Sequence, residues 1–212
     1  MSREIKEIGY YPPTSVSKDS ELFSPFSNAN IALGEFPNTI PLLCLTLNKK
    51  ANKTNFLHTV NPDFGLIVNE KVKSMLSKFK LEEHRFYKVN IEQNNKLLDY
   101  YWFHFFDDLF KYVDFSKTTI DIFHKFNFNV LDSVFLKSED NLKNIRSTLG
   151  FEREVRLKEL YFNDLFPEYD IMVNNIIGYG NLISEKLLNS LHENNITGYE
   201  VNPYTIIKSG NG

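Results

Sequence analysis

The chain has 212 residues, with 24 basic and 27 acidic side chains, and its formal net charge at pH 7 is -3. Because this charge is slightly negative, the protein has no overall positive field that would attract a phosphate backbone, and nucleic acid is not expected as a partner. With 42% hydrophobic residues, 19 Phe among them, the composition is that of a globular domain and excludes a disordered or fibrous chain.

The single cysteine and the apolar segments restrict the location of the protein. Cys44 can form neither an intramolecular disulfide nor a multi-cysteine metal site, and its apolar surroundings predict a small core residue. The N-terminus has no hydrophobic signal-peptide region, and the longest apolar stretch, Ile40–Leu47, is too short to span a bilayer. We therefore expect a cytoplasmic protein that does not contact a membrane.

The first 60 residues are rich in Pro, Ser and Asn. Each proline disfavours helix at the residue before it, so residues 1–60 predict an irregular arm packed on a domain formed by residues 61–212. The best strand in the arm is Thr39–Leu47, and Asn48–Asn55 reads as a polar loop.

A strand-helix-strand unit follows at residues 65–91. Leu66–Val68 is a short apolar run that predicts a buried strand, and Asn69 is placed to cap the next helix. The apolar face of that helix consists of Val72, Met75, Leu76 and Phe79. Phe86–Ile91 alternates as a strand, and a hairpin turn at Gln93–Lys96 leads into a strand at Leu97–Phe106.

A third strand-helix element is predicted in the middle of the chain. Asn129–Leu136 reads as its strand, and Ser138 caps a helix that buries Leu142, Ile145 and Leu149. Two further strands are predicted at Arg153–Tyr161 and Ile171–Ile177, whereas Leu109–Val113 fits a strand and a helix equally well.

Residues 181–203 repeat the pattern of residues 65–91. Val68-Asn69-Glu70-Lys71-Val72 matches Ile183-Ser184-Glu185-Lys186-Leu187, and Ser184 is placed to cap a helix as Asn69 does. Tyr87-Lys88-Val89-Asn90 matches Tyr199-Glu200-Val201-Asn202. Both matches occur in the same order, which indicates an internal duplication. The predicted fold class is α+β and strand-rich, with two related strand-helix-strand units around a mostly antiparallel or mixed sheet.

Candidate sites for chemistry are few. Gly178-Tyr179-Gly180 follows a predicted strand, as in a dinucleotide-binding turn, but Ile183 occupies the third glycine position. Asp107 and Asp108 lie near His104, yet adjacent residues of a strand point to opposite faces. The histidines show no metal-ligand spacing, so no metal, cofactor or catalytic residue is predicted and the protein is not expected to be an enzyme. A nucleotide-binding domain or small enzyme that uses the glycine turn remains the alternative.

Aromatic residues fill the stretch between Asp99 and Asp107. Because they face both sides of the predicted strand, both of its faces are expected to be buried against other parts of the protein. A central strand of the sheet would satisfy this pattern without any function. One face could instead line an aromatic groove for a partner, with Tyr and Trp as anchors.

Several of these segments resemble a family of bacterial immunity proteins. The matching residues are Leu66-Ile67-Val68-Asn69-Glu70-Lys71, Tyr100-Tyr101-Trp102, Val113-Asp114-Phe115-Ser116, Ile183-Ser184-Glu185-Lys186-Leu187 and Thr197-Gly198-Tyr199-Glu200. Together they are similar to immunity-protein family eleven of polymorphic-toxin systems, a former domain of unknown function. The first junction has Asn69 where Ser is expected, and the N-terminal arm has no counterpart.

The resemblance implies a protein that binds a cognate toxin or effector in the producing cell and occludes it, without a cofactor or a reaction. An acidic face would suit a basic toxin such as a nuclease. We expect a monomer or weak homodimer; a scaffold subunit would instead form a stable homo-oligomer. Acidic and aromatic placement selects the candidate partner-binding residues Tyr100, Trp102, Asp107, Asp108, Asp114, Glu159, Asp164 and Glu168.

Overall fold

The computed structural model describes residues 4–17, 31–40, 43–59, 63–178 and 180–208. It divides the chain into two compact units. Unit 1 comprises Met1–Asp107, Tyr169–Met172 and Ile183–Asn202, and unit 2 comprises Asp108–Glu168, Val173–Leu182 and Pro203–Gly212. The expected α+β, strand-rich fold class is confirmed. The boundary expected at residue 61 does not separate the two units.

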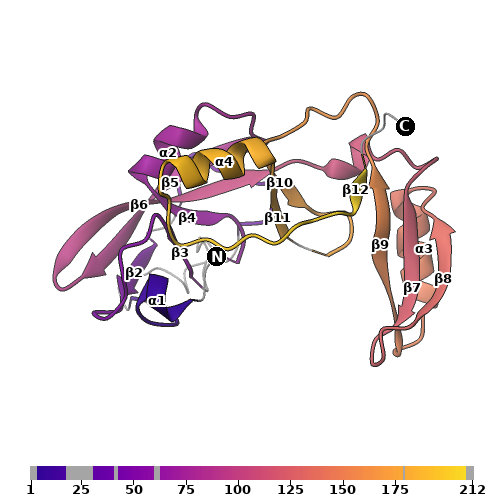
Figure 1. Ribbon diagram of the computed structural model, residues 1–212, viewed down its shortest axis with the longest axis horizontal. Coiled ribbons are helices and arrows are strands. Elements are labelled where there is room, and N and C mark those ends of the chain that lie inside the picture. Colours follow the sequence, from indigo (N-terminus) through magenta and orange to yellow (C-terminus); the bar gives the residue numbers. More distant parts are fainter. Residues whose placement is uncertain (1–3, 18–30, 41–42, 60–62, 179, 209–212) are drawn as a thin grey trace. The chain divides into compact units, whose positions relative to one another are not determined.

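Unit 1 is built on a six-stranded mixed sheet (Figure 1). Its strands are β1 (Thr14–Val16), β2 (Cys44–Leu47), β3 (Phe56–Leu57), β4 (Leu66–Asn69), β5 (Glu83–Gln93) and β6 (Lys96–Phe106). Their order is β1-β2-β5-β6-β4-β3; β2 pairs in parallel with β5, and the other neighbours are antiparallel. The described part of the first 60 residues supplies β1, β2 and β3 to this sheet.

The strand expected at Thr39–Leu47 is shorter in the structure. Strand β2 begins at Cys44, and residues 41 and 42 lie outside the described part of the chain. Cys44 is half-buried on this strand. Short helix α1 (Ile5–Ile8) lies in the same N-terminal region, where the backbone amide of Asn52 donates to the carbonyl of Ile8.

The hairpin of β5 and β6 confirms the predicted turn. The two strands pair from Glu83↔Phe106 to Gln93↔Lys96, and Asn94 and Asn95 form the turn with φ of 53° and 60°. Asparagine tolerates this left-handed backbone better than most residues, and two such positions suit a two-residue hairpin. Strand β6 therefore occupies the middle of the sheet, between β5 and β4.

Both faces of this sheet are covered. The core on one face consists of Leu43, Leu45, Leu47, Ala51, Leu57, Ile67, Tyr87, Val89, Ile91, Tyr100 and Trp102. On the other face, α2 (Glu70–Leu76) and α4 (Glu185–Glu193) lie side by side, joined by a hydrogen bond of 2.6 Å from Lys71 Nζ to the carbonyl of Asn194 (Figure 1). The central-strand interpretation of the aromatic stretch is therefore confirmed.

The predicted helix caps are present. The Asn69 side chain accepts a hydrogen bond from the amide of Val72 at the start of α2, and Ser184 does the same for Leu187 at the start of α4. These bonds satisfy amides that have no partner within the helix.

The second copy of the repeat lacks its final strand. Residues 199–202 carry no strand, because the backbone before them is bonded elsewhere. The Thr197 carbonyl accepts from the amide of Phe56, and the amide of Gly198 donates to Glu7 Oε1 at 2.8 Å. Gly198 has φ of +89°, and a β-carbon there would collide with the carbonyl of Phe56. The expected strand-helix-strand unit is complete only in residues 65–91.

Unit 2 has a sheet of its own, with the order β12-β9-β7-β8. Its elements in chain order are the 3-10 helix η2 (Leu109–Tyr112), β7 (Thr119–His124), β8 (Val130–Phe135), α3 (Glu139–Thr148), β9 (Arg153–Tyr161) and β12 (Ile207–Lys208). Strand β10 (Ile171–Asn174), which begins in unit 1, pairs with β11 (Gly180–Ile183). The predicted β8, α3 and β9 are confirmed, including the cap from Ser138 to the amide of Asn141.

Strand β7 was not predicted, although it lies between β8 and β9. Helix α3 covers this sheet, and its Leu142 is buried together with Ile120, Val155 and Leu157 of the strands. Strand β8 is at the edge of the sheet, and five of its six residues are exposed.

Candidate functional site

The two aromatic candidates for partner binding lie in the core of unit 1. Tyr100 is 4% exposed and its hydroxyl donates to the carbonyl of Thr54 at 2.7 Å. Trp102 is fully buried and its Nε1–H donates to the carbonyl of Phe64 at 2.9 Å. A partner could reach neither side chain without opening the sheet, so these two positions are corrected to core residues.

The acidic candidates between residues 107 and 114 serve local structure. Asp107 accepts a hydrogen bond of 2.7 Å from the hydroxyl of Tyr169, and Asp108 caps η2 by accepting from the amide of Phe110. Asp114 Oδ1 accepts from the hydroxyl and the amide of Ser116. The hydroxyl contact is the main reason that the pKa of Asp114 is lowered, while burial acts in the opposite direction.

The three remaining acidic candidates are dispersed. Glu159 is half-buried on β9, whereas Asp164 and Glu168 are exposed in the segment that follows this strand. Nothing in the described hydrogen bonds or ion pairs joins these carboxylates into one site.

The glycine turn connects β10 to β11, two strands of one small sheet. Gly178 has φ of +82° and is open to solvent on its Cα side, and Tyr179 lies outside the described residues. A dinucleotide-binding turn leads from a strand directly into a helix whose N-terminus receives the phosphates. That helix is not at this turn, since α4 begins only at Glu185, after β11.

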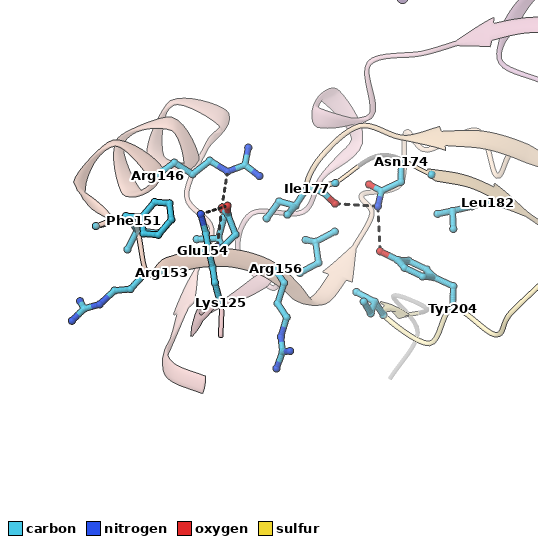
Figure 2. Close-up of a pocket in the computed structure, with 17 residues that line it drawn as sticks. Lys125, Arg146, Phe151, Arg153, Glu154, Arg156, Asn174, Ile177, Leu182 and Tyr204 are labelled. Carbon is cyan, nitrogen blue, oxygen red and sulfur yellow. Dashed lines mark hydrogen bonds and ion pairs between the residues drawn. The ribbon is translucent and has the colours of Figure 1, made fainter. Parts of the chain in front are cut away.

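A cleft of about 910 Å³ opens within unit 2 beside this turn (Figure 2). Its apolar wall is formed by the end of α3, β9, the β10–β11 hairpin and the segment before β12, through Leu149, Val155, Leu157, Ile177, Leu182 and Ile206. At one end, the Asn174 amide donates to the carbonyl of Ile177 at 3.4 Å and to the hydroxyl of Tyr204 at 3.3 Å. Burial raises the pKa of Tyr204, so its hydroxyl is protonated at neutral pH.

The charged residues of the cleft are mainly basic. Its lining contains Lys125, Arg146, Arg153 and Arg156 against one acid, Glu154, a sum of 4 - 1 = +3. Lys125 and Arg146 converge on Glu154, at 3.5 Å and 4.0 Å, whereas Arg153 and Arg156 extend away from β9 (Figure 2). Arg156 pairs with the nearly buried Asp121 at 3.3 Å. The cleft therefore combines an apolar wall with a basic rim.

Exposed apolar side chains lie on the β7–β8 hairpin and at Phe151, in the turn between α3 and β9. We call them the hairpin surface: Phe126, Phe128, Val130, Leu131, Phe135 and Phe151, all between 48% and 81% exposed. Phe151 also lines the cleft, lies 6.1 Å from Phe126 between ring centroids, and has the Lys125 ammonium 5.7 Å from its ring. The cleft and the hairpin surface are thus continuous through Phe151.

Sequence reasoning missed both features. The alternation of Ile120 and Ile122 with polar neighbours could have identified β7. Phe126, Phe128 and Val130 also alternate with polar residues, but that pattern does not distinguish a buried face from an exposed one.

The described residues contain no group of three or more His, Cys, Asp or Glu side chains arranged to hold a metal ion. Within the same residues, no helix is long and apolar enough to cross a membrane. Comparison of the chain with protein-family models, with curated proteins and with solved structures finds no match.

Proposed function

We propose that this protein is a cytoplasmic immunity protein that binds a cognate toxin or effector and occludes it. One observation carries the proposal: the hairpin surface exposes six large apolar side chains in one part of unit 2. Exposed apolar residues that occur together, unlike single ones, are typical of surfaces that bind another protein. The resemblance of residues 65–90 and 182–203 to immunity-protein family eleven supports the choice of partner.

The edge strand β8 strengthens the argument. Natural proteins protect exposed sheet edges with charges, prolines or covering segments, because an open edge pairs with other chains. Strand β8 has Asp132 as its only charged residue and contains no proline. A partner that added a strand to β8 would hydrogen-bond to its exposed edge, and the side chains of the added strand would cover apolar residues on both faces of β8.

The experiment is co-purification of the full chain with the product of the neighbouring gene, followed by titration of the pair. We expect the double variant Phe126→Ser/Phe128→Ser to bind at least about tenfold more weakly and to lose protection against the toxin, because buried aromatic anchors dominate such interfaces. Leu97→Ser is the matched control: Leu97 is 74% exposed, but in the β5–β6 hairpin of unit 1. A panel of neighbouring toxins that are neither bound nor neutralised would exclude the function.

A nucleotide-binding function is the second candidate, and one observation favours it. Gly178 and Gly180 line the same cleft as the four basic residues, so phosphates at the turn would have cations nearby. Thermal unfolding in the presence of nucleotides and dinucleotides tests this function, since a ligand at a hundred times its dissociation constant stabilises by about 2.7 kcal/mol. Absence of a shift with every compound would remove the candidate.

A further inference from the structure

We propose that the cleft of unit 2 receives an acidic segment of the partner protein, one that carries an apolar side chain between carboxylates. This inference rests on the proposed function and specifies the chemistry of its partner. It also reverses the sequence-based expectation that an acidic face of this protein meets a basic toxin.

The charges of the cleft are arranged to accept a carboxylate. Lys125 and Arg146 share the single carboxylate of Glu154, so this group of three has an excess positive charge. Both cations keep a substantial exposed fraction, 39% and 44% of the side chain. Arg153 adds another cation at the rim and has no ion pair among the described residues. A carboxylate of the partner would therefore pair with the two cations that Glu154 already holds in place. Its position near an apolar wall would strengthen the attraction between opposite charges.

A free anion would leave the apolar wall of the cleft uncovered, so the ligand is expected to carry an apolar side chain as well. Val155 and Leu157 are at most 5% exposed, but the half-buried Leu149, Ile177 and Leu182 face the cleft with Phe151 beside them. An apolar side chain of about the size of Leu or Phe would cover this wall and gain about 1.5–3 kcal/mol by its burial. The continuity with the hairpin surface through Phe151 means that one partner could occupy both.

A single-stranded nucleic acid is the competing occupant, because it also combines negative charge with rings that stack on aromatic residues. The cleft suits it less well. Its wall is mainly aliphatic, and among the described lining residues only Phe151 and Tyr204 carry a ring on which a base could stack.

The first experiment measures binding of labelled probes to the full chain by fluorescence anisotropy. The probes are the capped peptide Glu-Glu-Leu-Phe-Glu-Glu, the same peptide with Gln for each Glu, and a single-stranded oligothymidylate of similar length. We expect the acidic peptide to bind at least about tenfold more tightly than the other two and to weaken with added salt. Equal binding of the Gln peptide, tighter binding of the oligonucleotide, or no binding of any probe would overturn the inference.

Matched variants connect this binding to the cleft. We expect Arg146→Glu/Arg153→Glu to weaken the acidic peptide at least about tenfold, whereas Arg146→Lys/Arg153→Lys retains most of the affinity. Lys96→Glu, at an exposed position of unit 1, is the control for a general loss of positive charge. Thermal unfolding of each variant verifies that it is folded. Peptide binding that is insensitive to the cleft reversal would contradict the assignment.

The same variants separate this inference from the proposed function. If the neighbouring toxin binds the wild-type chain and binds Arg146→Glu/Arg153→Glu equally well, the proposed function stands and the cleft assignment fails. If no neighbouring toxin binds but the acidic peptide binds the cleft, the cleft assignment stands and the immunity function fails.

Discussion

At the scale of single residues, His104 is the least expected side chain in the core. It is fully buried on β6, stacked between Trp102 and Phe36 at centroid distances of 5.0 Å and 4.5 Å. Neither ring nitrogen has a hydrogen-bond partner among the described residues. Burial lowers its pKa from 6.5 to about 4, so the ring is neutral at pH 7.

This burial makes stability depend on pH. As the pH falls through 6.5 the unfolded chain binds a proton at His104, but the folded chain does not do so until about pH 4. Stability that is fully present above pH 6.5 is therefore lost progressively between pH 6.5 and 4, by at most about 3 kcal/mol. Urea unfolding of wild type and His104→Phe at pH 7.5 and 4.5 measures the effect. The variant is expected to lose less stability than wild type over this interval, and an identical loss would contradict the prediction.

Asp170 is a second buried ionisable residue. Its surroundings favour the charged form, whereas those of His104 favour the neutral form. Burial alone would raise its pKa, but hydrogen bonds from the amide of Lys80, the hydroxyl of Ser184 and the ammonium of Lys186 outweigh burial and lower it. The carboxylate thus ties the segment after α2 to the start of α4. Its contribution to stability is present above the ordinary pKa of an aspartate and is lost as the pH falls through the lowered value.

At the scale of elements, most of the predicted strands and helices are present. At these positions the capping residues and the apolar pattern favour the same structure as the packing around them. The caps at Asn69, Ser138 and Ser184 were predicted from residue type and are all formed. The final strand of the second repeat is absent, and the residues before it bond elsewhere: Thr197 to Phe56 of β3, and Gly198 to Glu7. Such long-range bonds cannot be read from the local pattern.

The caps allow a graded prediction for the helices. Ser138→Ala is expected to cost about 1 kcal/mol, because it removes only the bond to the amide of Asn141. Ser184→Ala is expected to cost about 2 kcal/mol, because this hydroxyl also donates to Asp170 at 2.7 Å. Urea unfolding monitored by circular dichroism gives the comparison.

The control for these caps is Ser147→Ala, at an exposed position in the last part of α3. We expect a change within about 0.5 kcal/mol there, since alanine favours helix and no cap is lost. A cost at Ser184 no larger than the cost at Ser138 would show that the bond to Asp170 does not stabilise the native chain.

At the scale of the whole molecule, the chain contributes three separate segments to each unit. Residues 169–172 and 183–202 complete unit 1, and they carry Asp170 as well as the buried Leu187 and Leu191 of α4. The sequence predicted one arm and one domain because the composition changes near residue 61, but composition does not reveal which distant segments pack together. The same limit hid the cleft, whose walls come from residues 125–157, 174–182 and 204–206.

Truncated chains test this arrangement. Trp102 is the only tryptophan of the sequence and is buried in unit 1, so its fluorescence reports on that unit alone. A chain that ends at residue 168 is expected to lose the cooperative urea transition of Trp102, because α4 and Asp170 are removed. A chain that ends at residue 202 keeps all of unit 1 and is expected to retain a transition close to that of the full chain. A normal transition in the shorter chain would disprove the dependence on α4.

This division of the chain also affects the order of events during synthesis. Translation of Asp107 finishes the first segment of unit 1, but its last segment ends at Asn202, 202 - 107 = 95 residues later. At about 5–20 residues per second, the nascent sheet waits about 5–20 s on the ribosome before α4 can cover it. During that interval the face that α2 and α4 share remains incompletely covered, so we expect the growing chain to be more prone to aggregation than a chain with consecutive domains.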